Sequence, residues 1–150
     1  MSALTGTWGE VIFSNRADFT ALGTFTAEAS LLGGNLQPFL PAAYFGYNNG
    51  LGRACKLIAR GVLSSTATPT YTFQVRLGTT SGSTYLSGTS VGVSAALTTA
   101  SGITNKWWEL ELLMIANILG IGTNTTTLCC SGSVRSPGGL AAPYEYALEP

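Results

Sequence analysis

The amino-acid sequence predicts an all-β protein, on three observations. Gly, Ser and Thr together supply about a third of the 150 residues, and the apolar residues come in short runs between them. Two segments, residues 71–77 and 108–112, alternate strictly between apolar and polar side chains. Short strands joined by turns, as in a β-sandwich or barrel, have this composition. A chain of this length forms one domain with a core and is too short for two ordinary domains.

Alternation with a period of two predicts three strands, over residues 53–63, 71–77 and 108–112. The inward positions of the first two strands are Cys55, Leu57, Ala59, Gly61, Tyr71, Phe73, Val75 and Leu77. The outward charges are basic on the first two strands, at Lys56, Arg60 and Arg76, and acidic on the third, at Glu109 and Glu111. Cross-strand pairs of opposite sign would support a sheet by roughly 0.2–1 kcal/mol each. The alternative is that these charges are only solvated.

A helix over residues 109–119 is the alternative to the third strand. Leu110, Leu113, Met114 and Asn117 fall at helical spacing, and Gly120 would cap such a helix. The strand is favoured because residues 108–112 alternate cleanly. The stretch 78–104, which is rich in Gly, Ser and Thr, predicts a hairpin followed by a long loop of weakly specified register.

The chain is predicted to consist of an N-terminal arm (residues 1–7), a β-sandwich domain (residues 8–135) and a C-terminal arm (residues 136–150). Neither arm has the periodicity of a core element, and such tails fray unless something holds them, so we expect a neighbouring subunit to do so. Pro137 and the two glycines after it argue against a central strand. Tyr144, Tyr146 and Leu148 alternate, which predicts that the C-terminal arm lies as an added strand along a neighbour.

Charged residues make up only 9% of the chain, and seven basic residues balance seven acidic ones. This balance gives no electrostatic footprint for nucleic acid, and it favours a homo-oligomer. No stretch reaches the 18 or so apolar residues of a membrane span, and the N-terminus lacks the pattern of a secretory signal. The three cysteines, an odd number with two of them adjacent, do not make a disulfide framework, so we expect buried free thiols in a protein made in a reducing cytoplasm. A bridge from Cys55 to Cys129 or Cys130 is the alternative.

Most of the residues that build catalytic and metal sites are missing. The chain has no histidine and a single aspartate, Asp18. These absences exclude Ser-His-Asp and Cys-His catalysis and a calcium loop. We therefore expect no enzymatic activity, no cofactor and no metal. The alternative is a glycosidase pair formed by the closely spaced carboxylates of Glu109 and Glu111.

Aromatic residues are the remaining candidates for a site. Trp107 and Trp108 are adjacent, so on a strand they face opposite ways and at least one of them should lie at a surface or interface. Tyr44 and Tyr47 cluster with Asn48 and Asn49, which is the composition of a sugar-binding loop. A loop of aromatic residues that plugs the core is the alternative for this second group.

Two regions, residues 44–79 and 107–127, carry a resemblance. The first combines a basic and apolar strand, Gly-Val, a turn, Thr-Pro-Thr, a strand and Leu-Gly-Thr-Thr, and the second begins with a Trp-Glu-Leu strand. This pattern resembles structural proteins of tailed-bacteriophage virions, of the capsid decoration (cement) type.

The resemblance implies a jelly-roll-like β-sandwich that forms a homotrimer on the capsid exterior and contacts the major capsid protein. Aromatic and apolar anchors dominate such interfaces. The residues expected at the interface are Tyr44, Tyr47, Trp107, Trp108, Tyr144, Tyr146 and Leu148. The alternative function is a receptor- or carbohydrate-binding module of a phage fibre or tail.

Overall fold

The computed structural model describes residues 14, 23, 28–31, 40, 44–45, 54–78, 88–118, 127–136 and 145–149. For residues 117, 118, 127 and 145–149 this description covers the backbone. The chain divides into two units, residues 1–42 and 43–150, and all the strands given below belong to the second. The predicted N-terminal arm, residues 1–7, lies outside the described residues.

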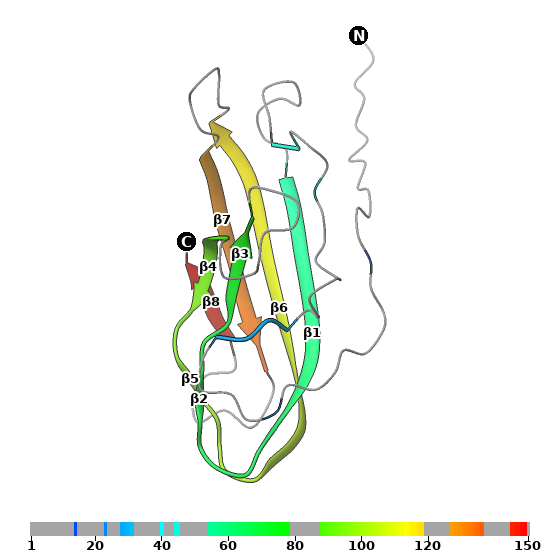
Figure 1. Ribbon diagram of the computed structural model, residues 1–150, viewed down its shortest axis with the longest axis vertical. Coiled ribbons are helices and arrows are strands. Elements are labelled where there is room, and N and C mark those ends of the chain that lie inside the picture. The colour runs from blue at the N-terminus through cyan, green and yellow to red at the C-terminus, as the bar shows by residue number, and fades with distance from the viewer. Residues whose placement is uncertain are drawn as a thin grey trace. The chain divides into compact units, whose positions relative to one another are not determined.

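The described part of the chain contains eight strands (Figure 1). They are β1 (Ala54–Ser65), β2 (Thr70–Tyr71), β3 (Gln74–Leu77), β4 (Thr89–Ser94), β5 (Leu97–Thr98), β6 (Ile103–Ile118), β7 (Thr127–Arg135) and β8 (Glu145–Glu149). Six of them form one antiparallel sheet in the order β1-β6-β7-β8-β4-β3, and β2 pairs with β5. None of the described residues forms a helix that could cross a membrane. The all-β prediction is confirmed, and the alternative helix over residues 109–119 is wrong because β6 runs through them to Ile118.

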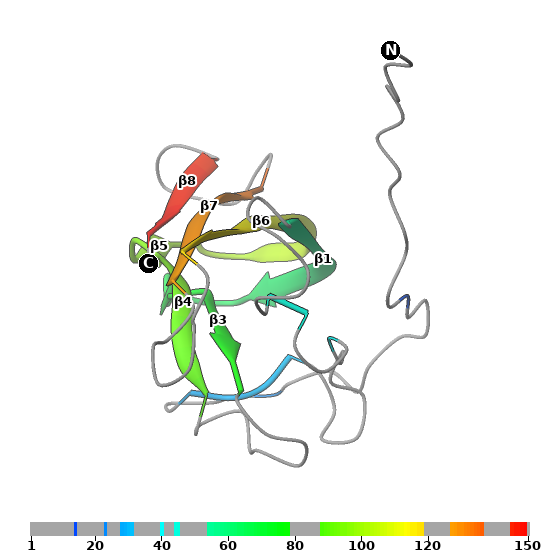
Figure 2. The same ribbon diagram turned by 90° about the horizontal axis from the view of Figure 1, so that it is seen from above.

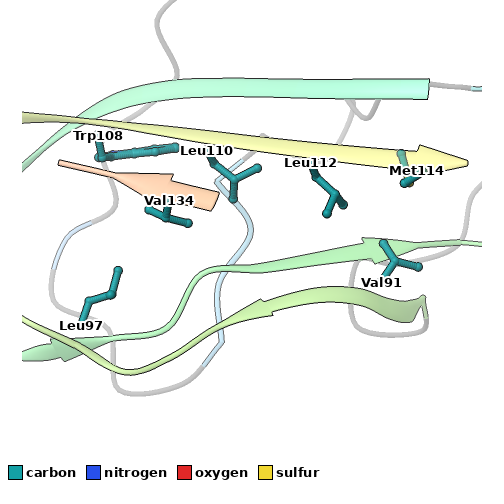
Figure 3. Close-up of a cluster of buried hydrophobic side chains, with 7 residues drawn as sticks. All are labelled: Val91, Leu97, Trp108, Leu110, Leu112, Met114 and Val134. Carbon is teal, nitrogen blue, oxygen red and sulfur yellow. The ribbon is translucent and has the colours of Figure 1, made fainter. Parts of the chain in front are cut away.

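The six-stranded sheet curls over, so that β3 and β4 lie opposite β1, β6 and β7 (Figure 2). Buried side chains from four strands meet in the space between (Figure 3). They are Val91, Leu97, Trp108, Leu110, Leu112, Met114 and Val134. Full burial of an apolar side chain contributes roughly 1.5–3 kcal/mol, so this cluster is the main support of the fold. The finer prediction of a jelly-roll β-sandwich remains a prediction.

The alternation predicted for the first strand is confirmed. Along β1 the side chains are alternately exposed and half-buried, with Cys55, Leu57, Ala59 and Gly61 on the inner side. β1 pairs with β6 in an unbroken register from Ala54↔Ile115 to Leu63↔Lys106. A strand and its partner that are each apolar on one face pack that face on the core, and the opposite face remains in water.

The predicted strand over residues 71–77 is divided between two sheets. Tyr71 belongs to β2, which pairs with β5, whereas residues 74–77 form β3, which pairs with β4. The register also shifts between Val75 and Arg76. Arg76, which was predicted to face outward, is half-buried, and its guanidinium donates to the Gly88 carbonyl at 3.1 Å. The stretch predicted as a hairpin and a long loop does pair β3 with β4, but part of the predicted loop forms β4 and β5.

A β-bulge in β6 allows side chains both before and after it along the strand to point into the core. The register passes from Leu63↔Lys106 to Ser65↔Ile103, which leaves one extra residue on β6. Asn105 lies in this bulge with φ 48°, a left-handed conformation that asparagine tolerates. Its backbone N–H donates to the Ser64 hydroxyl at 2.9 Å. The extra residue reverses the alternation, and Ile103 is therefore buried as well as Trp108.

Two glycines are required by close packing in the β1-β6-β7 part of the sheet. Gly61 lies beneath Trp108, and a Cβ there would come within 2.7 Å of the indole ring. At Gly132 a Cβ would overlap the backbone carbonyl oxygen of Glu111 and lie 2.9 Å from Leu112 Cα. The ring of Trp108 therefore packs against β1 at Gly61. It also packs against the ring of Phe73, with ring centroids 4.9 Å apart.

The C-terminal residues form a strand inside the sheet of their own chain. β8 pairs with β7 from Gly132↔Leu148 to Arg135↔Glu145, and with β4 at Val93↔Glu149 and Ser94↔Leu148. The strand expected around Tyr146 and Leu148 is therefore present, but its neighbours belong to the same chain. The expectation that proline and glycine would keep this segment out of a central strand is wrong for residues 145–149, because those breakers precede the strand by several residues.

Candidate interaction surface

The candidate site is the solvent-facing side of β1 and β6, which we call the outer face. It consists of Lys56, Ile58, Arg60 and Val62 on β1 and of Trp107, Glu109, Glu111 and Leu113 on β6. These positions alternate with the core residues, so the pleat of the two strands directs them away from the core. The long, regular register of β1 and β6 holds all eight side chains in rows across the two strands.

Four large apolar side chains are exposed on the outer face. The exposed fractions are 65% for Val62, 50% for Trp107, 48% for Ile58 and 36% for Leu113. Val62 and Trp107 are direct cross-strand partners, so they form one apolar row. Single exposed apolar residues are normal, but a group of them on two neighbouring strands marks an interaction site.

Two ion pairs cross the outer face between the apolar residues. Lys56 Nζ lies 2.7 Å from Glu111 Oε1, and Arg60 Nε donates to Glu109 Oε2. Both bases are on β1 and both acids are on β6. The complementarity predicted for these four residues is confirmed. Because the pairs are largely exposed, each contributes about 0–1 kcal/mol to stability, and their larger effect is to fix the charge pattern of the surface.

An open depression of about 280 Å³ adjoins the Arg60–Glu109 pair, lined by Arg60, Gly61, Trp107, Trp108 and Glu109. It is smaller than the roughly 300–1,000 Å³ of small-molecule pockets. Glu109 and Glu111, the carboxylates of the alternative glycosidase prediction, are each bound by a basic side chain. Within the described ranges no three His, Cys, Asp or Glu side chains come together as a metal site would require.

The structure places the predicted interface residues in different surroundings. Trp107 is exposed and Trp108 is buried, so the two do face opposite ways, and Trp108 is a core residue rather than an interface residue. Tyr44 lies in a turn, half-buried, and its hydroxyl donates to the Ala54 carbonyl at 3.0 Å. Its ring packs edge-on against Phe45, with centroids 4.9 Å apart.

The other predicted residues are not placed in the site. Tyr47, Asn48, Asn49 and Tyr144 lie outside the described residues, and Tyr146 and Leu148 are described by their backbone in β8. Sequence reasoning assigned none of Ile58, Val62 and Leu113 to a site. The signal was present in the sequence, since an apolar residue at the polar phase of an alternating strand has no place in the core.

The three cysteines are free thiols, as predicted. Cys55 and Cys130 are half-buried on the inner side, on either side of Met114 in β6, whereas Cys129 is exposed. A bridge between β1 and β7 would span two strand spacings, about 9–10 Å, which exceeds the reach of a disulfide. Burial raises the pKa of the Cys55 thiol. Burial and the neighbouring Cys129 raise the pKa of the Cys130 thiol.

Comparisons with known proteins assign the chain to no group. No protein-family model matches it, and no curated protein sequence or solved structure shows significant similarity.

Proposed function

We propose that the chain is a structural protein of a tailed-bacteriophage virion, of the capsid decoration (cement) type. In this proposal it has a jelly-roll-like β-sandwich, is made in the host cytoplasm and lies on the capsid exterior. It acts by packing against itself and against the major capsid protein, with no catalysis and no cofactor. A homotrimer is the oligomer that the resemblance to such proteins implies.

The outer face is the observation that supports this proposal most directly. It presents exposed apolar side chains on a regular, hydrogen-bonded ribbon, and its charges are already paired. Such a surface is suited to contact with another protein, because it has apolar area to bury and few unpaired charges to desolvate. Contacts of modest size, repeated by symmetry over a shell, stabilise a lattice through multivalency.

The composition of purified particles tests this proposal. Particles produced from the genome that encodes the chain should contain it in copy numbers on the order of hundreds, in a fixed ratio to the major capsid protein, as closed symmetry requires. Purified chain added to shells that lack it should co-sediment with them and raise their resistance to heat. Absence of the chain from particles, or failure to bind the shells, would contradict the proposal.

A receptor- or carbohydrate-binding module is the second candidate, favoured by Trp107. Its half-exposed indole ring lies beside the Arg60–Glu109 pair in an open depression, which combines a flat aromatic surface with fixed polar groups. A panel of oligosaccharides titrated against tryptophan fluorescence checks this function. A saturable change that disappears in Trp107→Ala, with the melting temperature preserved, would favour it, as would particles that contain only a few dozen copies of the chain, roughly what a fibre supplies.

A further inference from the structure

The charges of the outer face are segregated by strand. The bases Lys56 and Arg60 are on β1, and the acids Glu109 and Glu111 are on β6. The apolar residues are shared, with Ile58 and Val62 on β1 and Trp107 and Leu113 on β6. We propose that the outer face binds the outer face of a second copy of the same chain. The two copies are related by a two-fold axis that lies in the interface, parallel to the strands and midway between β1 and β6.

This axis places the β1 of each copy over the β6 of the other and keeps the rows of the sheet in step. In the register of one chain, Val62 is level with Trp107 and Arg60 is level with Glu109. In the pair, Val62 therefore lies over Trp107 of the second copy and Arg60 over its Glu109. Lys56 reaches Glu111 of the second copy by the same diagonal step that it takes within its own chain. Arg60 then faces an acid directly and Lys56 faces one diagonally, and the two most exposed apolar residues, Val62 and Trp107, face each other.

The same arrangement agrees with the way in which sheets pack. Two sheets that meet face to face keep their strands within about 30° of each other, at a separation of about 10 Å. An axis parallel to the strands belongs to this aligned class. The other in-plane axis, perpendicular to the strands, would place β1 over β1 and hence Lys56 and Arg60 over bases. The segregation of charge by strand thus selects one of the two axes.

The charge pattern also favours a second copy over other occupants. Both bases of the outer face are already bound by acids, so a nucleic acid or an acidic peptide would have to displace Glu109 and Glu111 from them. A second copy brings its own acids and bases in the matching order. The formal net charge of the chain is zero, so two copies approach without long-range repulsion.

The size of the outer face sets the expected strength. Eight side chains on each copy are far fewer than the roughly 20–30 residues per side of a standard stable interface. We therefore expect a reversible dimer that forms in concentrated solution or where copies are held side by side. Its apolar residues supply the affinity, and its charges fix the register. The inference does not depend on the proposed function, and its two-fold symmetry differs from that of the trimer that the resemblance implies.

Charge reversal on one strand at a time tests the proposal. Sedimentation equilibrium from about 10 µM to about 1 mM spans the range in which a small interface dissociates. The wild-type chain should form dimers. Lys56→Glu/Arg60→Glu and Glu109→Lys/Glu111→Lys should each stay monomeric in this range, because each places like charges opposite one another in the pair. An equimolar mixture of the two variants should form a heterodimer, since the bases of one then face the acids of the other.

A further variant keeps the test meaningful if the reversed chains do not fold. Val62→Asp puts an unpaired charge in the centre of the apolar row and should raise the dissociation constant by about tenfold or more, the effect of burying an unpaired charge. Ala96→Asp is the matched control, because Ala96 is exposed and lies outside the outer face. A wild-type chain that is monomeric up to about 1 mM, or an assembly that Val62→Asp leaves unchanged, would overturn the proposal.

Discussion

Gly132 on β7 lies directly against the backbone of β6. A Cβ at this position would overlap the Glu111 carbonyl oxygen, and backbone atoms, unlike the end of a flexible side chain, cannot move aside. We expect Gly132→Ala to lower the free energy of unfolding by about 2 kcal/mol or more, in the upper part of the range for overpacked sites. Gly23→Ala is the control, because nothing lies within 4 Å of the Cβ that it would add. Urea denaturation of the two variants measures the difference, and equal midpoints would show that the strands separate easily.

The three thiols should differ in their reaction with an alkylating reagent. Cys129 is exposed, whereas burial protects Cys55 and Cys130 and raises the pKa of both thiols, so a smaller fraction of each is thiolate. At pH 8 one thiol should react rapidly with iodoacetamide and two slowly. Cys129→Ser should abolish the rapid phase and leave the slow one. Peptide mass spectrometry identifies the sites, and rapid modification of Cys55 in the folded chain would be the contrary result.

The raised pKa values of these two thiols also predict how the stability of the folded chain changes at alkaline pH. A folded chain that holds its thiol protons more tightly than the unfolded chain gains stability that is complete below the ordinary thiol pKa of 9.0. That contribution is lost as the pH rises through the raised pKa values, because the unfolded chain then binds fewer protons than the folded one. The melting temperature should therefore fall more steeply above pH 9 in the wild type than in a Cys55→Ala/Cys130→Ala variant. Parallel slopes would contradict this.

At the scale of an element, the bulge of β6 depends on Asn105. Its left-handed backbone costs about 1–2 kcal/mol for most residues, and its contacts with Ser64 fix the irregularity. We expect Asn105→Ala to lower the free energy of unfolding by about 1–2 kcal/mol, and Asn105→Gly to lose less because glycine adopts this φ freely. Thermal melts of both variants supply the comparison. A glycine variant less stable than the alanine variant would show that the Ser64 contacts matter more than the backbone conformation.

Irregularities of this kind mark the limit of what the sequence predicts about the fold. The alternation in residues 53–63 and 108–112 is regular, and the corresponding parts of β1 and β6 have the predicted faces. The alternation in residues 71–77 is equally regular, yet the segment is divided between β2 and β3. Side-chain alternation indicates which face of a strand is buried, but it does not indicate which strand pairs with it. The partners of β2 and β3 lie 12 to 28 residues along the chain, in a Gly- and Ser-rich stretch with little pattern of its own.

At the scale of the whole second unit, the place of β8 within the sheet determines the expected effect of a truncation. Deleting residues 137–150 removes the strand that joins β7 to β4. The melting temperature should fall by about 10 °C or more, since several backbone hydrogen bonds and the continuity of the sheet are lost. Deleting Pro150 alone should have little effect, and calorimetry compares the two. An unchanged melt with weakened binding to a neighbouring subunit would restore the original prediction of an arm.

The candidate site was only partly predictable from the sequence, because it too depends on how the strands pair. Trp107 was identified because two adjacent tryptophans on a strand must face opposite ways, and the pairing of the charges followed from their signs. Sequence alone did not show that Ile58, Val62 and Leu113 would join Trp107, because that grouping requires the register in which β1 and β6 pair. It also did not show that β8 would be a strand of the domain, since the segment owes its place to β7 and β4.

The position of β8 also sets an order on folding during synthesis. The ribosome makes β8 after every other strand of the sheet, yet β8 lies in the interior of the strand order, between β7 and β4. The β1-β6-β7 portion and the β3-β4 portion therefore wait as two half-sheets, each with an open edge, until residues 145–149 have left the exit tunnel. The pairing of β8 with β4 joins segments that are distant along the chain, and such pairings form slowly. In the interval, the open edges of β7 and β4 are where a nascent chain would first need a chaperone, or would first join a neighbouring chain on the same messenger RNA.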